Sequence, residues 1–206
     1  MRSLIGVLAG CSSLLALVLA AVVIVQRRAA RALRKLACSE PLTGLANRRE
    51  FIRVLDSEIS RTSRTGRPFS VVAIDVDRLK LINDRFGHRA GNRAIRRVAN
   101  AIRVSCRVTD VAARIGGDEF AVILPEATDG EARQFLARVH AVLARHTRGG
   151  VVSISGGVAE HPRDGLGAEP LLDIADRALY VDKRRRERST PASIPRLVPG
   201  AQRQIA

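Results

Sequence analysis

The stretch Gly116-Gly117-Asp118-Glu119-Phe120 lies between two apolar runs, at residues 111–115 and 120–124. A Gly-Gly pair between two such runs is a strong signal for a β-hairpin, here with two carboxylates at its bend. We expect the glycines to allow positive φ angles and to let a bulky ligand approach the backbone. The stretch therefore predicts paired strands with a ligand site at their turn. Taken alone, it is equally typical of an acidic surface turn.

A second acidic pair, Asp75 and Asp77, follows the β-branched run at residues 71–74, which predicts a buried strand. Because side chains two residues apart on a strand share a face, both carboxylates are expected to leave it together. Carboxylates gathered from the two clusters repel one another, and a hard cation such as Mg²⁺ removes this penalty by accepting their oxygens. The two clusters together predict a divalent-metal site beside a phosphate.

Helical and strand patterns alternate along the chain. The expected elements are a helix over 46–64 with Phe51, Leu55 and Ile59 inward, a strand at 71–74, a segment at 81–86, a helix over 92–105, the hairpin, a helix over 130–145, a strand at 151–155 and a helix over 171–184. This β-α-β-β-α-β order predicts an α+β fold, a ferredoxin-like sandwich with a mixed, mainly antiparallel sheet flanked by helices. The same arrangement resembles the palm of nucleotide polymerases. Residues 189–206 are expected to be disordered.

The N-terminal segment from Leu4 to Val25 has no charged residue. As a helix it would extend roughly 33 Å and cross a bilayer. We therefore expect a transmembrane anchor over 1–26 and a basic juxtamembrane linker helix over 27–38. The arginines of this linker place the rest of the chain in the cytoplasm, at the inner membrane, by the positive-inside rule. A cleaved signal peptide and a lipoprotein processing site at Cys11 are the alternatives.

The net charge of +15 is unevenly distributed. Residues 39–182 are nearly balanced, and the excess lies in the two terminal segments, where anionic lipid would attract it. No recognised nucleic-acid motif or aromatic stacking platform accompanies the charge, so no nucleic-acid partner is expected. The three cysteines, Cys11, Cys38 and Cys106, lack metal-ligand spacing, which argues against structural zinc and a disulfide framework.

Several further motifs lie around the acidic clusters. They are found at residues 42–49, 75–84, 86–88, 114–120, 153–159 and 175–180. With these motifs the chain resembles, from about Ser39 to about Arg188, a GGDEF domain, the catalytic module of diguanylate cyclases. The resemblance implies a catalytic domain over 39–188 that condenses two GTP molecules into cyclic di-GMP and pyrophosphate with Mg²⁺ or Mn²⁺.

The resemblance also implies roles at the metal site. The ligands would be Asp75, the backbone carbonyl of Val76, Asp118 and Glu119. The implied catalytic residues are Asp118, which would also accept the proton of the attacking 3′-hydroxyl, together with Glu119 and Lys80, which would stabilise charge on the phosphates.

The implied substrate contacts include one departure from the family. Asn83 would bind the guanine edge, Lys183 the phosphates, and Gly116 and Gly117 the approaching nucleotide. Asn92 stands where the family usually has an aspartate, and an amide offers one acceptor where a carboxylate accepts both guanine donors. We therefore expect weaker GTP binding and relaxed discrimination against ATP.

Two further departures flank the domain. Glu187 replaces a phosphate-binding arginine, with Arg186 or Arg188 as candidates to take its role. Glu40 replaces the aspartate before Pro41 and reaches one methylene further.

An Arg-x-x-Asp pattern, Arg107 and Asp110, precedes the hairpin at the spacing of the family's inhibitory product site, with Arg138 as a secondary contributor. The resemblance implies product inhibition by cyclic di-GMP. It also implies a homodimer, because each site holds one GTP and the product joins two. The alternative is a catalytically weak or inactive receptor for cyclic di-GMP.

Overall fold

The structure is a computed structural model that describes Leu19 and residues 21–27, 37–145 and 152–189. Its contacts divide the chain into two units, Met1–Ser39 and Glu40–Ala206. The predicted basic linker at 27–38 and the predicted tail at 189–206 fall almost entirely outside the described residues.

The N-terminal unit corrects the prediction of a membrane anchor. Among all described residues, no helix meets the length and hydropathy that a membrane span requires. The predicted single-pass anchor over 1–26 and the inner-membrane localisation are therefore contradicted. Most of the predicted span, Leu4 to Val25, lies outside the described residues.

The second unit is built on one five-stranded sheet with the order β1-β3-β4-β2-β5. The strands are β1 Ala46–Asn47, β2 Phe69–Val76, β3 Val111–Arg114, β4 Glu119–Pro125 and β5 Ile154–His161. The pair β1 and β3 is parallel, and every other pair is antiparallel. This mixed sheet confirms the predicted α+β class, and the element order confirms the predicted alternation. The short edge strand β1 was not expected.

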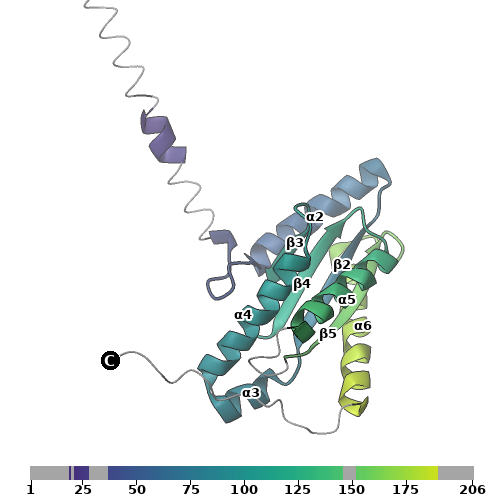
Figure 1. Cartoon of the computed structure of the whole chain (residues 1–206). Coiled ribbons are helices and arrows are strands. Elements are labelled where there is room, and N and C mark those ends of the chain that lie inside the picture. The colour runs from purple at the N-terminus through teal and green to yellow at the C-terminus, as the bar shows by residue number, and fades with distance from the viewer. Residues whose placement is uncertain (1–18, 20, 28–36, 146–151, 190–206) are drawn as a thin grey trace, which may run out of the picture. The chain divides into compact units, whose positions relative to one another are not determined.

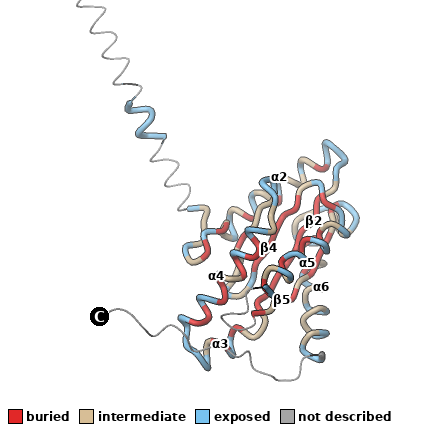
Figure 2. Tube along the Cα trace, viewed as in Figure 1, coloured by how far each residue is buried: buried red, intermediate tan, exposed pale blue. Residues whose placement is uncertain are grey.

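Helices cover both faces of the sheet, as Figure 1 shows. The helices are α2 Arg48–Thr65, α3 Leu79–Phe86, α4 His88–Ser105, α5 Asp129–Arg145 and α6 Ala168–Ser189. One apolar cluster joins α2 and α6 to the first face, and another joins α3, α4 and α5 to the second. Along β2, Val71 and Ala73 belong to the first cluster, while Val72 and Ile74 belong to the second. Buried residues therefore run the length of the central strands (Figure 2).

Local sequence explains where α2 begins and ends. The Asn47 side chain accepts a hydrogen bond from the backbone N–H of Glu50 at 3.0 Å, which caps the first turn. Gly66 ends the helix with a φ of 70°, a left-handed conformation that glycine adopts without strain. Phe51 and Leu55 are buried, as their spacing predicts. The helix begins two residues later than predicted because Ala46 and Asn47 pair with β3.

The bounds of helix α4 and strand β5 also differ from the predictions. Helix α4 begins at His88 rather than at residue 92, directly after the turn at Gly87, whose φ is 78°. Strand β5 covers Ile154–His161 rather than 151–155, because it pairs with β2 along its whole length. The backbone pairing continues across Gly156 and Gly157, which interrupt the apolar pattern from which the strand was predicted.

At Gly157, the backbone of α6 lies directly against the sheet. A Cβ at this position would overlap backbone atoms of Ala175 and Leu179 in α6. Backbone atoms cannot move aside as a side-chain end can, so only glycine fits. The helix is therefore held directly against β5 at this residue.

We expect Gly157→Ala to lower the free energy of unfolding by at least about 2 kcal/mol, because the added methyl group forces α6 away from the sheet. Chemical denaturation followed by circular dichroism measures the change. Gly130→Ala in α5 is the matched control, since a Cβ there meets no atom within 4 Å. Equal stability of the two variants would contradict the close approach of α6.

Candidate functional site

The strand register brings the two acidic clusters together. Asp75, near the end of β2, is paired with Glu119 on β4 and with Ser155 on β5. The backbone N–H of Val76 donates to the carbonyl oxygen of Asp118 at 3.0 Å. The structure thus places Asp75 beside both acidic residues of the hairpin, as predicted.

The hairpin turn closes differently from the prediction. The backbone N–H groups of Ile115 and Gly116 both donate to the Glu119 carbonyl, at 3.0 and 3.3 Å. Neither Gly116 nor Gly117 has a positive φ, so that expectation was wrong. The Glu119 carboxylate occupies the space that a Cβ on Gly116 would need, while Gly117 borders open space. The two glycines therefore matter at this turn because they have no side chains, and not because they adopt an unusual backbone conformation.

Asp75 forms an ion pair with Lys183 of α6, with 2.8 Å between Oδ1 and Nζ. Burial raises the pKa of the Asp75 carboxyl, and the charges of Asp118 and Asp77 act in the same direction, while Lys183 opposes them. The hydrogen bond to Asp75 in turn raises the pKa of Lys183. A buried carboxylate, its acidic neighbours and one ammonium group therefore meet at a single point.

Asp77 has a different partner from Asp75. Its Oδ1 accepts a hydrogen bond from the Ser155 hydroxyl at 2.7 Å, and its backbone N–H donates to the Ser153 carbonyl at 3.0 Å. The side chain is therefore anchored to β5, although its charge still acts on Asp75 and Lys183.

The orientation of α6 at Lys183 depends on Asp182 and His140, which the sequence did not single out, and on Arg186. The Asp182 carboxylate accepts hydrogen bonds from the backbone N–H of Gly156 at 3.0 Å and from the guanidinium of Arg186 at 2.9 Å. Arg186 also lies 3.1 Å from His140 of α5. These contacts hold Arg186 against Asp182 and α5, which argues against its replacing the missing phosphate-binding arginine. In the sequence, only the spacing of four residues between Asp182 and Arg186 indicates that these two side chains pair.

Three predicted nucleotide contacts lie on α3 and at the start of α4. Lys80 is exposed on α3, and Asn83 is half-buried one turn later. The Asn83 amide lies where a Cβ on Gly91 would be, so the two helices approach closely. Asn92, the next residue, is exposed. Asn83 and Asn92 therefore lie close together at the junction of α3 and α4.

Glu40 connects the turn at residues 40–45 to the hairpin. Its carboxylate accepts hydrogen bonds from the backbone of Leu42 and from both the backbone and hydroxyl of Thr43. Although burial acts in the opposite direction, these bonds hold the pKa of Glu40 below its usual value. Arg114 pairs with Glu40 at 2.9 Å and donates to the Gly117 carbonyl at 2.7 Å. No local spacing in the sequence predicts this bridge, because Arg114 and Glu40 lie 74 residues apart.

The residues predicted to form an inhibitory site lie in one region between α4, β3 and α5. Asp110 accepts the backbone N–H of Arg107 at 2.6 Å, which closes a turn. Arg138 is exposed on α5, with its guanidinium 5.7 Å from the centre of the Phe135 ring. Burial raises the pKa of the Cys106 thiol to about 12, Asp110 adds to the shift and Arg138 opposes it, so both charges lie near Cys106.

The donor atoms of the site suit a hard divalent cation. Asp75, Asp118 and Glu119 offer only oxygens, and the crowding of their charges is relieved by a cation. No three His, Cys, Asp or Glu side chains in the described part of the chain gather closely enough to hold a metal by themselves. A cation here would therefore need further oxygens, such as those of phosphate and water.

Known proteins are similar to this chain in sequence. A sequence model of the family "Diguanylate cyclase, GGDEF domain" matches residues 37–189. The diguanylate cyclase DgcP of Pseudomonas aeruginosa is 38% identical over 156 residues, which is 73% of this chain and 23% of that protein. The diguanylate cyclase DosC of Escherichia coli is 38% identical over 149 residues, 70% of this chain and 32% of that protein.

A solved structure shows the same fold. The coiled coil and GGDEF domain of DgcB from Caulobacter crescentus, in complex with c-di-GMP, superposes with a TM-score of 0.73 at 29% identity, covering 80% of this chain and 90% of that one. The chain spans less than a third of the length of the two curated relatives. With the family match over 37–189, these likenesses show that the chain belongs to the diguanylate cyclase GGDEF domain family.

Proposed function

We propose that this chain condenses two GTP molecules into cyclic di-GMP and pyrophosphate. The observation that carries the proposal is the meeting of Asp75, Asp118 and Lys183, where a buried carboxylate, a second carboxylate and an ammonium group converge. Such a group of charges matches a nucleoside triphosphate with its divalent cation, which carry the complementary charges. The identity and coverage of the curated diguanylate cyclases support the same reaction.

The residues that would hold a magnesium or manganese ion are Asp75, the Val76 carbonyl, Asp118 and Glu119. When bound, this ion would polarise the α-phosphorus and lower the pKa of the ribose 3′-hydroxyl. Asp118 would accept the proton of that hydroxyl, because it is the half-buried carboxylate at the turn. Lys183, already within 2.8 Å of Asp75, would bind phosphate oxygens beside the carboxylates.

The remaining proposed contacts orient the nucleotide. Lys80 is exposed on α3 and would contact the phosphates, while Asn83 and Asn92 would contact the guanine. Gly117, which borders open space, would leave room for the triphosphate at the turn, beside Gly116. One domain holds one GTP under this proposal, so two domains must face each other as a homodimer.

Asp118→Asn tests the proposed reaction. Incubation of the full chain with GTP and Mg²⁺, followed by chromatography of the nucleotides, should show cyclic di-GMP formed by the wild type. The variant should be slower by on the order of 100-fold, because the amide neither accepts the proton nor carries the charge. Asp56→Asn, an exposed position on α2, is the control and should keep the wild-type rate. An unchanged rate in Asp118→Asn would refute the proposed role.

Asn92→Asp tests the proposed guanine contact. We expect the carboxylate to tighten GTP binding roughly tenfold, because it accepts both donors of the guanine edge, and to leave ATP binding unchanged. Competition between GTP and ATP for a fluorescent nucleotide measures both affinities. Asn100→Asp, exposed on the same helix, makes the same change of charge away from the site. If both variants bind GTP equally, Asn92 does not contact the base.

A second candidate function is a receptor for cyclic di-GMP without turnover. The grouping of Arg107, Asp110 and Arg138 around Cys106 favours it, as does the exposed Glu187, which would repel a triphosphate. The same residues would serve as the site of product inhibition in an active enzyme. Binding of cyclic di-GMP by a chain that forms none of it from GTP would distinguish the receptor from the cyclase.

Arg107→Ala is expected to weaken cyclic di-GMP binding at least tenfold, because it removes a charge-assisted contact to phosphate or guanine. Isothermal titration of the full chain with cyclic di-GMP measures the affinity. In an active enzyme the same change should raise the product concentration needed for half inhibition. Arg64→Ala on α2 provides a matched loss of charge, and an affinity unaltered by Arg107→Ala would exclude this site.

A further inference from the structure

Lys183 pairs with one of the proposed metal ligands. Its Nζ lies 2.8 Å from Oδ1 of Asp75, and the charges of Asp118 and Asp77 also act on it. Only 11% of the Asp75 side chain is exposed, against 37% of the Lys183 side chain. A cation that approaches this carboxylate therefore meets an ammonium group of the same sign that is already in contact with it.

The backbone of α6 is held in place beside this ion pair, whereas the lysine side chain has room to move. At Gly157 a Cβ would overlap backbone atoms of the helix, and Asp182 accepts a hydrogen bond from the Gly156 N–H at 3.0 Å. The lysine stem, by contrast, is a flexible chain of four carbons that is partly exposed. Lys183 can therefore turn away from Asp75 by a change of rotamer, without any movement of the helix.

We propose that Lys183 makes the site selective for a divalent cation that arrives with a triphosphate. Lys183 occupies Asp75 and releases it when phosphate oxygens take over the ammonium group. A cation that arrives alone must displace this group into water, which gives Lys183 no new partner. Phosphate oxygens instead offer it charge-assisted hydrogen bonds. The identity of the triphosphate rests on the proposed function, whereas the exclusion of a lone cation rests on the contact between Asp75 and Lys183.

This exchange couples the binding of the two ligands. If a cation at Asp75 frees Lys183 for phosphate, a triphosphate must strengthen cation binding by the same factor as the cation strengthens triphosphate binding. Removing the charge of Lys183 should reduce this factor. A lysine that served only as the permanent counter-ion of Asp75 would stay there when the cation binds, and its removal would then not favour a lone cation.

Lys183→Met in the full chain tests the proposal, with Mn²⁺ as the probe. Electron paramagnetic resonance of the free ion measures its affinity, first without nucleotide. We expect Mn²⁺ alone to bind at least tenfold more tightly to Lys183→Met than to the wild type, because the like charge is gone and Asp75 has lost its counter-ion.

The second measurement adds a GTP analogue with a methylene group between the α- and β-phosphates, which blocks cleavage there. After correction for Mn²⁺ held by the free analogue, the analogue should raise the affinity of the wild type for Mn²⁺. The rise should be at least tenfold smaller in Lys183→Met, because the variant has no ammonium group to transfer from Asp75 to phosphate.

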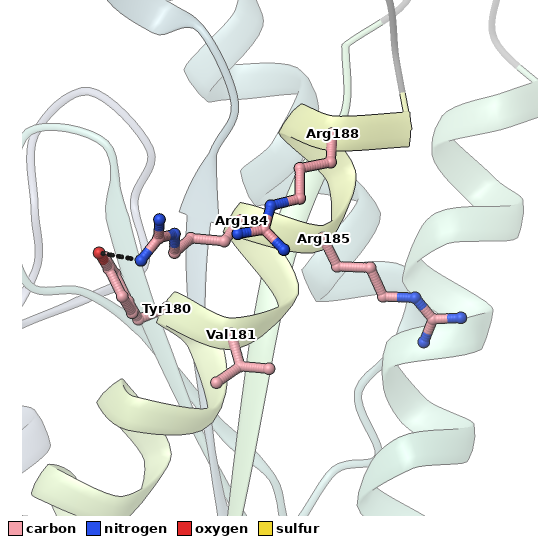
Figure 3. A pocket seen from close by; sticks show the side chains of 5 residues that line it. All are labelled: Tyr180, Val181, Arg184, Arg185 and Arg188. Carbon is pink, nitrogen blue, oxygen red and sulfur yellow. Dashed lines mark hydrogen bonds between the residues drawn. The ribbon is translucent and has the colours of Figure 1, made fainter.

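Arg184→Met is the matched control, since it removes the same charge from the next residue of α6. Arg184 contacts the Tyr180 hydroxyl at 3.4 Å on the exposed face of the helix, beside a surface hollow of about 560 Å³ (Figure 3). Its Mn²⁺ affinity should equal that of the wild type, which separates the contact at Asp75 from the general charge of the helix. If circular dichroism shows that Lys183→Met does not fold, Lys183→Gln takes its place, because its amide donates to Asp75 without a charge.

Three results would overturn the proposal. They are equal Mn²⁺ affinities of the wild type and the Lys183 variant without nucleotide, an equal gain of affinity in Arg184→Met, and a wild type whose Mn²⁺ affinity the analogue does not raise. Formation of cyclic di-GMP from GTP is measured separately. A failure of the proposed reaction is therefore distinguishable from a failure of the exchange at Asp75.

Discussion

The register of β2 between β4 and β5 is the constraint on which the site depends. Asp75 lies opposite Glu119 and Ser155 only because the apolar residues before it are buried on alternate faces, Val71 and Ala73 on one and Val72 and Ile74 on the other. A slip of one residue would exchange these faces and would separate Asp75 from the hairpin. The position of the acidic groups is therefore set mainly by hydrophobic packing along the strand, because the carboxylates repel one another and their favourable contacts are those with Lys183 and Ser155.

Helix α6 supplies a positive charge, that of Lys183, which offsets the repulsion among these carboxylates. Leaving a buried carboxylate unpaired is costly, and Lys183 is the cation that compensates Asp75. The lysine arrives there because Gly157 lets the helix backbone touch β5, and because Asp182 holds the next turn to the Gly156 N–H. The close approach at Gly157, the hydrogen bond from the Gly156 N–H to Asp182 and the Asp75–Lys183 ion pair therefore all hold α6 in place. A ligand cation arriving at Asp75 would compete with Lys183, which would then be available to phosphate.

Periodicity and short motifs in the sequence predicted the order of the elements and the meeting of the acidic clusters. The alternation of elements, the buried face of α2 and the proximity of Asp75 to Asp118 and Glu119 all followed from local patterns. Patterns without long-range information failed elsewhere: β1 forms only because β3 lies beside it, and β5 extends through glycines because β2 pairs with it. The membrane anchor was inferred from hydropathy alone, which the described helices do not support. The contacts of Asp182 with Gly156, of Arg186 with His140 and of Arg114 with Glu40 join distant segments, so no local spacing predicts them.

The departures from the family pattern differ in how the fold accommodates them. The longer side chain of Glu40 accepts hydrogen bonds from Leu42 and Thr43 and pairs with Arg114. Arg114 in turn donates to the Gly117 carbonyl at the hairpin. That change is absorbed within the protein and leaves the turn intact. Asn92 and Glu187 are exposed instead. Because no buried ion pair constrains these exposed side chains, we expect Asn92 and Glu187 to affect nucleotide affinity rather than folding.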